Sequence, residues 1–376
     1  MKEDCCNGTT CHSGPNADFM APEHARSYEI FVEGDDLFDA MVRDILKARR
    51  TILLETYILK EDRIGRRILD ALEAVARRGI EVHLRLDAFG SKGLVSRRTV
   101  DVLRESGVLV NWSRPWSWRH PLQYQRRNHR KLLAVDAAIA YIGGFNIGEE
   151  SSLICRGPQR WRDTHIRLTS AIAKQAAALF RDFAEKRKHR REEWIDGSLL
   201  MPNYGLACRY RWRCLLNNRF RMAAKRIWLT TPYFVPDSGT QKRLKNAAKR
   251  GVDVRVLVPA KSDVPITQWA ARMSYGNLLR VGVKIYEYRA RVLHAKTALI
   301  DDDWSMIGTS NFDYRSFFTN YELNFLSRSS EMNASLAAIF ADDLKTSARI
   351  SYSAWLKRPY LQQASELIGW MARRWL

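Results

Sequence analysis

A pattern of histidine, lysine and aspartate occurs twice in the chain with the same spacing. Its members are His129, Lys131 and Asp136 in the first copy and His294, Lys296 and Asp301 in the second. An asparagine follows each histidine after seventeen residues, at Asn146 and Asn311. From the residue frequencies of the chain, one histidine-lysine-aspartate match is expected about 0.02 times by chance. The repetition therefore indicates a duplicated fold that carries a function.

The side chains of this pattern suit a phosphodiester substrate. Lysine ammonium groups and asparagine amides can hold the non-bridging phosphate oxygens and stabilise the charge of a pentacoordinate transition state. One neutral histidine can attack phosphorus and form a covalent intermediate, while the other donates a proton to the leaving alkoxide and later accepts one from an alcohol or water. We therefore predict catalytic roles for His129, Lys131, His294 and Lys296, with Asn146, Asn311 and the same two lysines binding the phosphate.

Four carboxylates are placed where they can support this chemistry. Asp163 and Glu322 each open a predicted strand just after a copy of the pattern. We predict that they orient the catalytic histidines and separate their pKa values; a surface salt bridge is the alternative. Asp136 and Asp301, which belong to the pattern itself, end their predicted strands. They are candidates for a catalytic role and equally for fixing the turn that follows.

The elements that must position these residues come in the same order in both parts of the chain. We predict a strand, a helix, a strand and the motif strand at 50–57, 66–78, 80–86 and 131–136, and again at 226–233, 240–250, 252–258 and 296–301. Strands that alternate with helices favour an α/β sandwich with mostly parallel sheets. On a strand, residues two apart point to the same face, so each motif can direct its histidine and lysine to one place. The predicted fold has two similar α/β halves, a pseudo-two-fold axis and one shared active site.

The length and charge of the chain limit its organisation and its partners. A chain of 376 residues is long enough for two domains. We expect a flexible leader at 1–25, a first half at 26–200 and a second half at 201–376. Arginine supplies 45 of the 62 basic residues, and the net charge is +21. Because the guanidinium group matches phosphate oxygens, this charge favours an anionic partner, either nucleic acid or an anionic membrane.

The composition argues against several other classes of protein. No segment approaches the roughly 18 apolar residues of a membrane span, so any membrane contact is expected to be peripheral. The first 25 residues lack the apolar core of a secretory signal. Six scattered cysteines do not suggest a disulfide framework, which favours a location on the reducing, cytosolic side. Cys5, Cys6 and Cys11 match no common zinc spacing, and the sequence predicts neither a metal nor a cofactor.

Two segments combine apolar or aromatic residues with arginine. The first precedes the first motif, and its candidate headgroup and membrane contacts are Trp112, Arg114, Trp116, Trp118, Arg119, Arg126 and Arg127. Amphipathic rings settle at a membrane interface, but they also stack on single-stranded bases or cap a domain. The second segment is C-terminal, with Leu361, Ala364, Leu367, Ile368, Met371 and Trp375 at helical spacing. It is expected either to lie in a membrane interface or to pack on the core.

At these residues the chain resembles the phospholipase D superfamily, which has two His-x-Lys-x4-Asp motifs in a bilobal α/β fold. The second copy is especially similar, from Gly308 to Ser316 and then from Asn320 to Glu322. Within the superfamily the chain is most similar to the bacterial cardiolipin synthases. The stretches that match are 87–91, 143–148, 161–163, 231–237 and 250–255, and the resemblance covers about residues 28 to 345.

The resemblance implies transfer of a phosphatidyl group through a phosphohistidine, without a metal. Phosphatidylglycerol would be the donor, a second phosphatidylglycerol the acceptor, and glycerol the leaving group. By analogy, His129 is the nucleophile and His294 the general acid and base, or the two histidines exchange these roles. Synthases with two N-terminal membrane helices are common in the family, and this sequence shows none. The resemblance is therefore to the shorter, membrane-peripheral type, expected on the cytosolic side of the bacterial inner membrane.

Three functions remain open at this point. The chain can be a lipid phosphatidyltransferase, or a phosphodiesterase or nuclease of the same superfamily that hydrolyses lipid or nucleic-acid phosphodiesters. The spacing of the motifs does not distinguish an alcohol acceptor from water. A non-enzymatic binder of nucleic acid or membrane is the third function, and two complete motifs argue against it. The sequences that flank the motifs favour an anionic phospholipid, phosphatidylglycerol, over nucleic acid as the partner.

Overall fold

The computed structural model describes residues 27–119, 124–169, 171–184 and 193–373. The leader expected at 1–25 and Trp375 lie outside these residues. Within the described residues, none of the helices combines the length and the apolar character that crossing a membrane requires.

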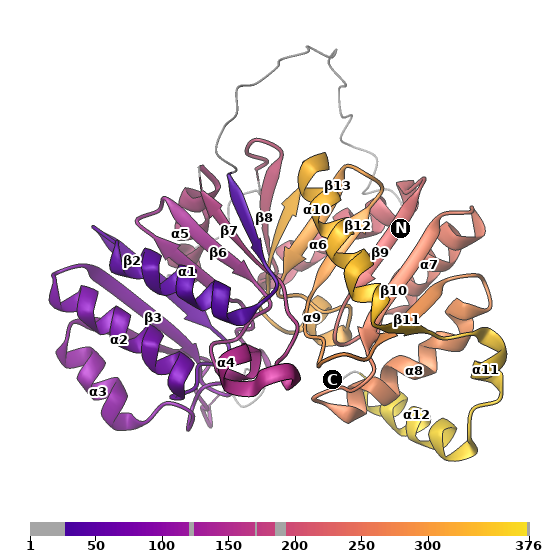
Figure 1. The fold of residues 1–376 in the computed structure, drawn as a ribbon, viewed down its shortest axis with the longest axis horizontal. Coiled ribbons are helices and arrows are strands. Elements are labelled where there is room, and N and C mark those ends of the chain that lie inside the picture. Colours follow the sequence, from indigo (N-terminus) through magenta and orange to yellow (C-terminus); the bar gives the residue numbers. More distant parts are fainter. Residues whose placement is uncertain (1–26, 120–123, 170, 185–192, 374–376) are drawn as a thin grey trace, which may run out of the picture.

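Two β-sheets stand side by side and divide the described chain into two halves (Figure 1). The first sheet has seven strands in the order β1 (Tyr28–Phe31), β7 (His165–Thr169), β6 (Ile139–Gly143), β5 (Leu132–Val135), β2 (Thr51–Thr56), β3 (Glu81–Asp87) and β4 (Val108–Ser113). The second has eight, in the order β15 (Ser347–Arg349), β11 (Lys284–Tyr288), β10 (Asp253–Pro259), β9 (Arg226–Thr230), β12 (Thr297–Ile300), β13 (Trp304–Gly308), β14 (Leu323–Ser327) and β8 (Ser198–Pro202). The predicted α/β class and its two similar halves are confirmed. The expected boundary between residues 200 and 201 falls inside β8, which pairs with β14 of the second sheet.

The prediction that the sheets are mostly parallel is wrong, because both sheets are mixed. Parallel pairs join only β2, β3 and β4 in the first sheet and β9, β10 and β11 in the second. These strands are linked by helical crossovers, which parallel pairing requires. The motif strands β5 and β12 instead run antiparallel to both neighbours. A short turn joins each to the next strand, and a hairpin of this kind is antiparallel.

The outer face of each sheet is covered by helices that form its own hydrophobic core. In the first half these are α1 (Gly34–Leu46), α2 (Arg63–Arg77) and α3 (Arg97–Glu105), and in the second α6 (Gly205–Met222), α7 (Ser238–Lys249) and α8 (Pro265–Leu279). The predicted helices at 66–78 and 240–250 are thus confirmed as α2 and α7. Each of these two helices is followed by a glycine with positive φ, +85° at Gly79 and +90° at Gly251. A residue with a Cβ would be strained in this conformation.

A third core lies between the two sheets and joins the halves. It includes Ile142 and Ile166 of the first sheet, Leu299 and Phe325 of the second, and apolar residues of α5 (Ala171–Ala184) and α10 (Ser330–Lys345). Because this core draws on both halves, neither half buries its inner face alone. The short helices α4 (Leu153–Arg156) and α9 (Tyr314–Phe318) follow the motif hairpins, while α11 (Tyr352–Leu356) and α12 (Tyr360–Ala372) come last.

Candidate active site

The two halves exchange backbone hydrogen bonds at the places where the motifs begin. Segment 127–129 of the first half forms a short parallel bridge with Tyr321 of the second, and segment 292–294 of the second forms one with Arg162 of the first. The backbone N–H of the motif histidine donates across each bridge, over 2.9 Å to the Tyr321 carbonyl and over 2.7 Å to the Arg162 carbonyl. Each bridge places the residue that follows, an acid in both cases, beside the histidine of the opposite half.

Glu322 of the second half holds His129 of the first. Nδ1 of His129 lies 2.9 Å from Oε2 of Glu322, and the carboxylate also accepts hydrogen bonds from Thr309 (2.5 Å) and Ser316 (3.0 Å). Burial raises the pKa of Glu322 to about 7, although Thr309 and the charge of Lys131 act in the opposite direction. Burial also lowers the pKa of His129 well below its ordinary value, and the nearby lysine ammonium groups add to this effect. Both effects favour the neutral form of His129.

Asp163 of the first half holds His294 of the second in the reciprocal arrangement. Nδ1 of His294 lies 2.5 Å from Oδ2 of Asp163. Burial raises the pKa of Asp163, but Lys296 and His294 outweigh this and hold its pKa below the ordinary value. Burial and Lys296 also lower the pKa of His294, while Asp163 opposes them. When Nδ1–H of a histidine donates to a carboxylate, the lone pair of Nε2 is left for chemistry.

Both motif lysines are buried behind the histidines. Lys131 Nζ donates to the carbonyl of His129 over 3.0 Å, and Lys296 Nζ donates to the carbonyl of His294 and lies 3.9 Å from Asp163. Burial lowers the pKa of Lys131 to about 7 and that of Lys296 to about 8, and Lys296 contributes to the first shift. A bound phosphate would favour the charged form of both lysines, because an opposite charge nearby raises a lysine pKa.

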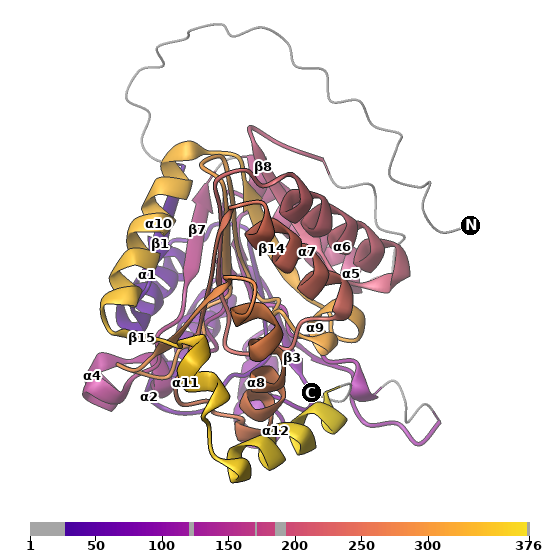
Figure 2. The ribbon, with the colours of Figure 1, turned by 90° about the vertical axis from the view of Figure 1, so that its right-hand side faces the viewer.

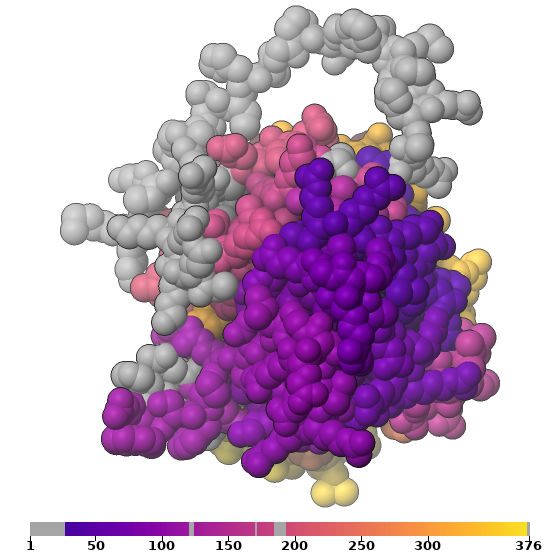
Figure 3. All heavy atoms as spheres, turned by 90° about the vertical axis from the view of Figure 1, so that its left-hand side faces the viewer, coloured from indigo at the N-terminus to yellow at the C-terminus, as the bar shows by residue number. Residues whose placement is uncertain are grey.

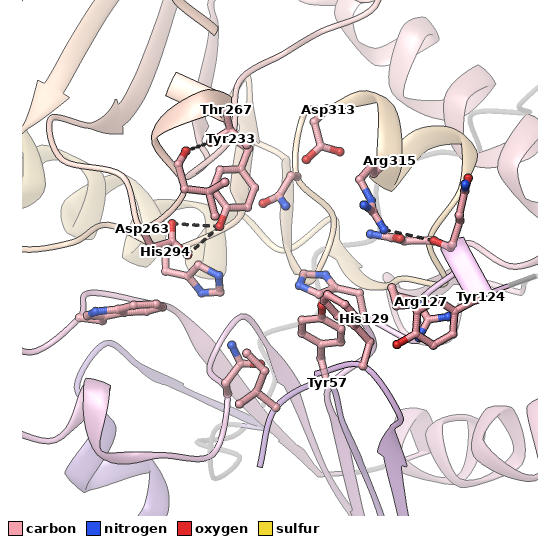
Figure 4. Close-up of a pocket in the computed structure, with 18 residues that line it drawn as sticks. Tyr57, Tyr124, Arg127, His129, Tyr233, Asp263, Thr267, His294, Asp313 and Arg315 are labelled. Carbon is pink, nitrogen blue, oxygen red and sulfur yellow. Dashed lines mark hydrogen bonds between the residues drawn. The ribbon is translucent and has the colours of Figure 1, made fainter. Parts of the chain in front are cut away.

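A pocket of about 580 Å³ opens between the halves, and both histidines lie on its wall. Figure 4 shows the rings of His129 and His294 facing each other across this space. The predicted phosphate ligands Asn146 and Asn311 line it as well. The ring of Tyr57 meets the ring of His129 edge to face at 5.0 Å, and Trp161 lies 5.4 Å from His294. Both histidine rings and both asparagine side chains are therefore reached from one cavity.

The structure brings eight of the predicted site residues together at or behind the wall of the pocket. His129, His294, Asn146 and Asn311 line the pocket, while Lys131, Lys296, Asp163 and Glu322 lie directly behind it. The sequence did not show which carboxylate pairs with which histidine. In the structure, each carboxylate contacts the histidine of the other half. Tyr57 and Tyr233 are further pocket residues that the sequence analysis missed. Each follows a strand that pairs with a motif strand, so position along the neighbouring strand could have identified them.

Asp136 and Asp301 are not brought to the pocket. They lie beyond the far ends of β5 and β12, with φ values of +53° and +51°. Their carboxylates accept backbone N–H groups from Arg49, Arg50 and Thr51 in the first half and from Ala224, Lys225 and Arg226 in the second. Of the two roles that the sequence left open, this geometry supports fixing the turn.

The residues expected to contact a headgroup or membrane differ in exposure and fall into three groups. Trp116, Trp118, Arg119 and Arg126 are exposed. Trp112 packs against the first hydrophobic core, and Arg114 is half-buried. Arg127 is buried and lines the pocket. The exposed surface of this loop is therefore smaller than the sequence suggested.

Two similar α/β halves that share one pocket, with paired histidines and carboxylates, define a phospholipase D-like protein. A sequence model of the family described as "Cardiolipin synthase, PLD-like domain" matches residues 41–182 and 216–344. The chain is 33% identical over 359 residues to the major cardiolipin synthase ClsA of Bacillus subtilis, covering 91% of this chain and 74% of the relative. It is 32% identical over 362 residues to a cardiolipin synthase of Clostridium perfringens, covering 90% and 75%. The chain belongs to the phospholipase D-like cardiolipin synthase family.

Solved structures show the same fold at lower identity. The crystal structure of phosphatidylserine synthase from Haemophilus influenzae superimposes with a TM-score of 0.73 at 15% identity, covering 94% of this chain and 96% of that one. A polyphosphate kinase from Porphyromonas gingivalis gives a TM-score of 0.62 at 16% identity, covering 87% and 49%. At these identities the likeness shows the fold alone.

The role of Asp136 in fixing the turn can be tested by mutation. Replacing Asp136 with Ala should lower the free energy of unfolding by about 1–2 kcal/mol, because several backbone N–H groups lose a charged acceptor. The specific activity of the folded protein should change by less than about twofold. Thermal unfolding together with activity per folded molecule measures both quantities. Asp136→Asn, which keeps one acceptor oxygen and tolerates positive φ, is the control; loss of turnover without loss of stability would assign Asp136 to the chemistry.

Proposed function

We propose that this protein is a cardiolipin synthase-like phosphatidyltransferase. It would move a phosphatidyl group from one phosphatidylglycerol to a second and release glycerol. The names of its relatives, which are cardiolipin synthases, support the product of this reaction. The observation that carries the proposal is the pair of facing histidines, each held by a carboxylate of the opposite half. A phosphodiester placed between them meets a nucleophile on one side and a proton donor on the other.

The different surroundings of the two histidines support distinct roles. The low pKa of His129 keeps its Nε2 lone pair available to attack phosphorus. The P–O bond to glycerol then breaks as the P–N bond forms, and His294 supplies the proton that the leaving alkoxide takes. Asp163, ionised and 2.5 Å away, stabilises the protonated form of His294 that this step needs. In the second step His294 accepts the proton of the incoming hydroxyl, and a new P–O bond replaces P–N.

We propose that the phosphate-binding groups stabilise the negative charge on the phosphate oxygens. Lys131 and Lys296 lie in a buried environment where water does not screen them, so their attraction to the equatorial phosphate oxygens is stronger than at a surface. Asn146 and Asn311 can donate amide N–H groups to the same oxygens from the pocket wall.

We also propose that the protein acts at the cytosolic surface of the bacterial inner membrane. Trp116 and Trp118 are 62% and 77% exposed on the loop after β4, which projects from the first half (Figure 3). Helix α12 packs on α8 through the face that carries Glu366 and Gly369. Of the two alternatives for this segment, packing on the core therefore describes only this face of the helix. Its other face exposes Leu361, Leu367, Ile368 and Met371.

The two exposed surfaces belong to segments that are connected to the wall of the pocket. The loop after β4 leads to Tyr124, and α8, on which α12 packs, carries Thr267; both residues line the pocket. Figure 2 shows α12 and the loop toward the same lower end of the molecule. An anionic leaflet suits apolar and aromatic residues combined with a net charge of +21.

The proposed reaction predicts its products. Vesicles of phosphatidylglycerol incubated with the protein, without added metal, should yield cardiolipin and glycerol in equal amounts. His129→Ala and His294→Ala should each lower the rate at least about 1,000-fold, because the attack and the proton transfer both disappear. Lipid chromatography with a glycerol assay measures both products. Phosphatidic acid as the sole lipid product would indicate hydrolysis, and cleavage of DNA in place of lipid would indicate a nuclease.

The hydrogen bond from Thr309 to Glu322 predicts a shift in the pH profile. A raised carboxyl pKa means that Glu322 becomes ionised as pH rises through about 7, so the activity that depends on the Glu322 carboxylate should rise over the same range. Thr309→Val removes a hydrogen bond that favours the ionised form of Glu322. The acidic limb of kcat/KM should therefore move to higher pH by about one unit. Thr309→Ser, which keeps the hydroxyl, should leave the limb in place; an unchanged limb in both variants would show that Glu322 does not control activity.

The proposed membrane surface predicts how binding responds to salt and mutation. Sedimentation with vesicles containing phosphatidylglycerol should show binding that weakens as ionic strength rises, since salt screens exposed charges. Trp116→Ala combined with Trp118→Ala should weaken binding about tenfold through the loss of interfacial aromatic area. Replacing Leu109, an exposed residue within β4, with Ala is the matched control. Equal binding by the double variant and the unmodified protein would contradict the assignment of this loop.

A further inference from the structure

Arg127 is a buried cation in the pocket wall whose hydrogen-bonding capacity is mostly unused. Its side chain is 3% exposed and lines the pocket. Nη1 donates to the carbonyl of Arg114 over a long 3.4 Å, while Nε and Nη2 are buried without a hydrogen-bond partner. Leaving charged donors buried and unsatisfied costs several kcal/mol in general. Such a group at the edge of a cavity indicates a ligand that completes it.

The neighbouring carboxylate of Asp87 forms a buried ion pair with Arg127 but leaves its Nε and Nη2 donors without a hydrogen bond. Asp87 lies 3.6 Å from Nη1 of Arg127, beyond ordinary hydrogen-bond length. Its oxygens accept the backbone N–H groups of Phe89 (2.9 Å), Gly90 (3.1 Å) and Asn128 (2.8 Å). Asp87 is therefore committed to the turn after β3, and the donors of Arg127 remain available.

The surroundings of Arg127 fix the guanidinium group and add positive charge. The guanidinium carbon lies 4.0 Å from the ring centroid of Tyr124 and 5.8 Å from that of Phe89. Arg315 and Asn320 also line the pocket. Figure 4 shows Arg127, Arg315 and Tyr124 grouped on the His129 side, while Asp263 and Tyr233 lie on the His294 side. A planar, stacked guanidinium group is suited to binding phosphate oxygens in pairs.

The distance between Arg127 and His129 suits a substrate with two phosphates. The two residues are alternate members of the extended segment that bridges to Tyr321. Alternate residues of an extended chain point to the same side and lie about 6.6 Å apart along it. Two phosphates joined through a three-carbon glycerol bridge have a separation of similar size. A phosphate at Arg127 would thus place the far hydroxyl of its glycerol near the phosphorus on His129.

We infer that Arg127, assisted by Arg315, binds the phosphate of the acceptor phospholipid. This inference rests on the proposed phosphatidyl transfer, in which two phosphodiesters enter the site and only one is attacked. The attacked phosphate lies between the histidines, and the acceptor phosphate at Arg127 keeps all its bonds. Its terminal hydroxyl attacks the phosphohistidine, loses its proton to His294 and displaces His129 from phosphorus. The product therefore carries one phosphate in each subsite.

The test compares an acceptor that carries a phosphate with one that does not. The first reaction is cardiolipin formation from phosphatidylglycerol vesicles. The second is exchange of radiolabelled free glycerol into phosphatidylglycerol, which uses the same phosphohistidine but a neutral acceptor. Arg127→Gln should slow cardiolipin formation about tenfold to a hundredfold, the effect expected when a charged hydrogen bond is lost. Glycerol exchange should stay within about twofold, and Arg127→Lys should recover part of the first activity.

The controls separate the possible outcomes. Arg98→Gln on the exposed surface of α3 changes the net charge equally and should alter neither reaction. If Arg127→Gln unfolds, which circular dichroism would show, the less buried Arg315→Gln should give the same selective loss. Equal loss of both reactions in a folded variant, or loss of neither, would overturn the inference. If the unmodified protein exchanges glycerol but forms no cardiolipin, the proposed function fails, whatever Arg127 does.

Discussion

The exchange of carboxylates between the halves is the constraint on which the rest of the structure depends. Glu322 and Asp163 are almost fully buried, and each obtains its histidine partner only from the other half. An unpaired buried carboxylate is costly, whereas a paired one in this setting is held firmly. The backbone bridges at Tyr321 and Arg162 fix the register of the exchange. The active site is therefore formed by the same contacts that join the halves, and neither half contains a complete site.

Duplication gave the two halves the same plan, and small differences make the two histidines unequal. Gly144 and Thr309 occupy corresponding positions after β6 and β13. A Cβ at Gly144 would lie 2.0 Å from Oδ1 of Asp163, so the short acid leaves room only for glycine. At the other position the Thr309 hydroxyl donates to the longer Glu322. The pKa of Glu322 is raised to about 7 while that of Asp163 is lowered. Unequal partners of this kind suit the proposed roles, in which one histidine attacks and the other carries the proton.

The sequence predicted the features that depend on local spacing. Residues two apart on a strand share a face, so His129 and Lys131 could be placed together without a structure, and helices α2 and α7 followed from their apolar periodicity. Antiparallel pairing of β5 was missed because periodicity does not distinguish a hairpin from a crossover. The choice of partner for Glu322 depends on packing between segments about 190 residues apart. Arg127 could not be told from the exposed arginines beside it, since burial is set by the fold.

The charge distribution in the pocket bears on the choice between transfer and hydrolysis. A phosphohistidine can react with water or with an alcohol, and water is always the more abundant. An acceptor held by its phosphate beside Arg127 would present its hydroxyl at a fixed distance from phosphorus, and correctly oriented groups can reach effective molarities of about 10⁵–10⁸ M. That advantage exceeds the concentration of liquid water. Tyr57, Tyr124 and Trp161 add apolar surface to the wall of the same pocket. A basic subsite next to the nucleophile can therefore favour transfer without any change in the catalytic groups, which explains how one pair of motifs can serve both reaction types.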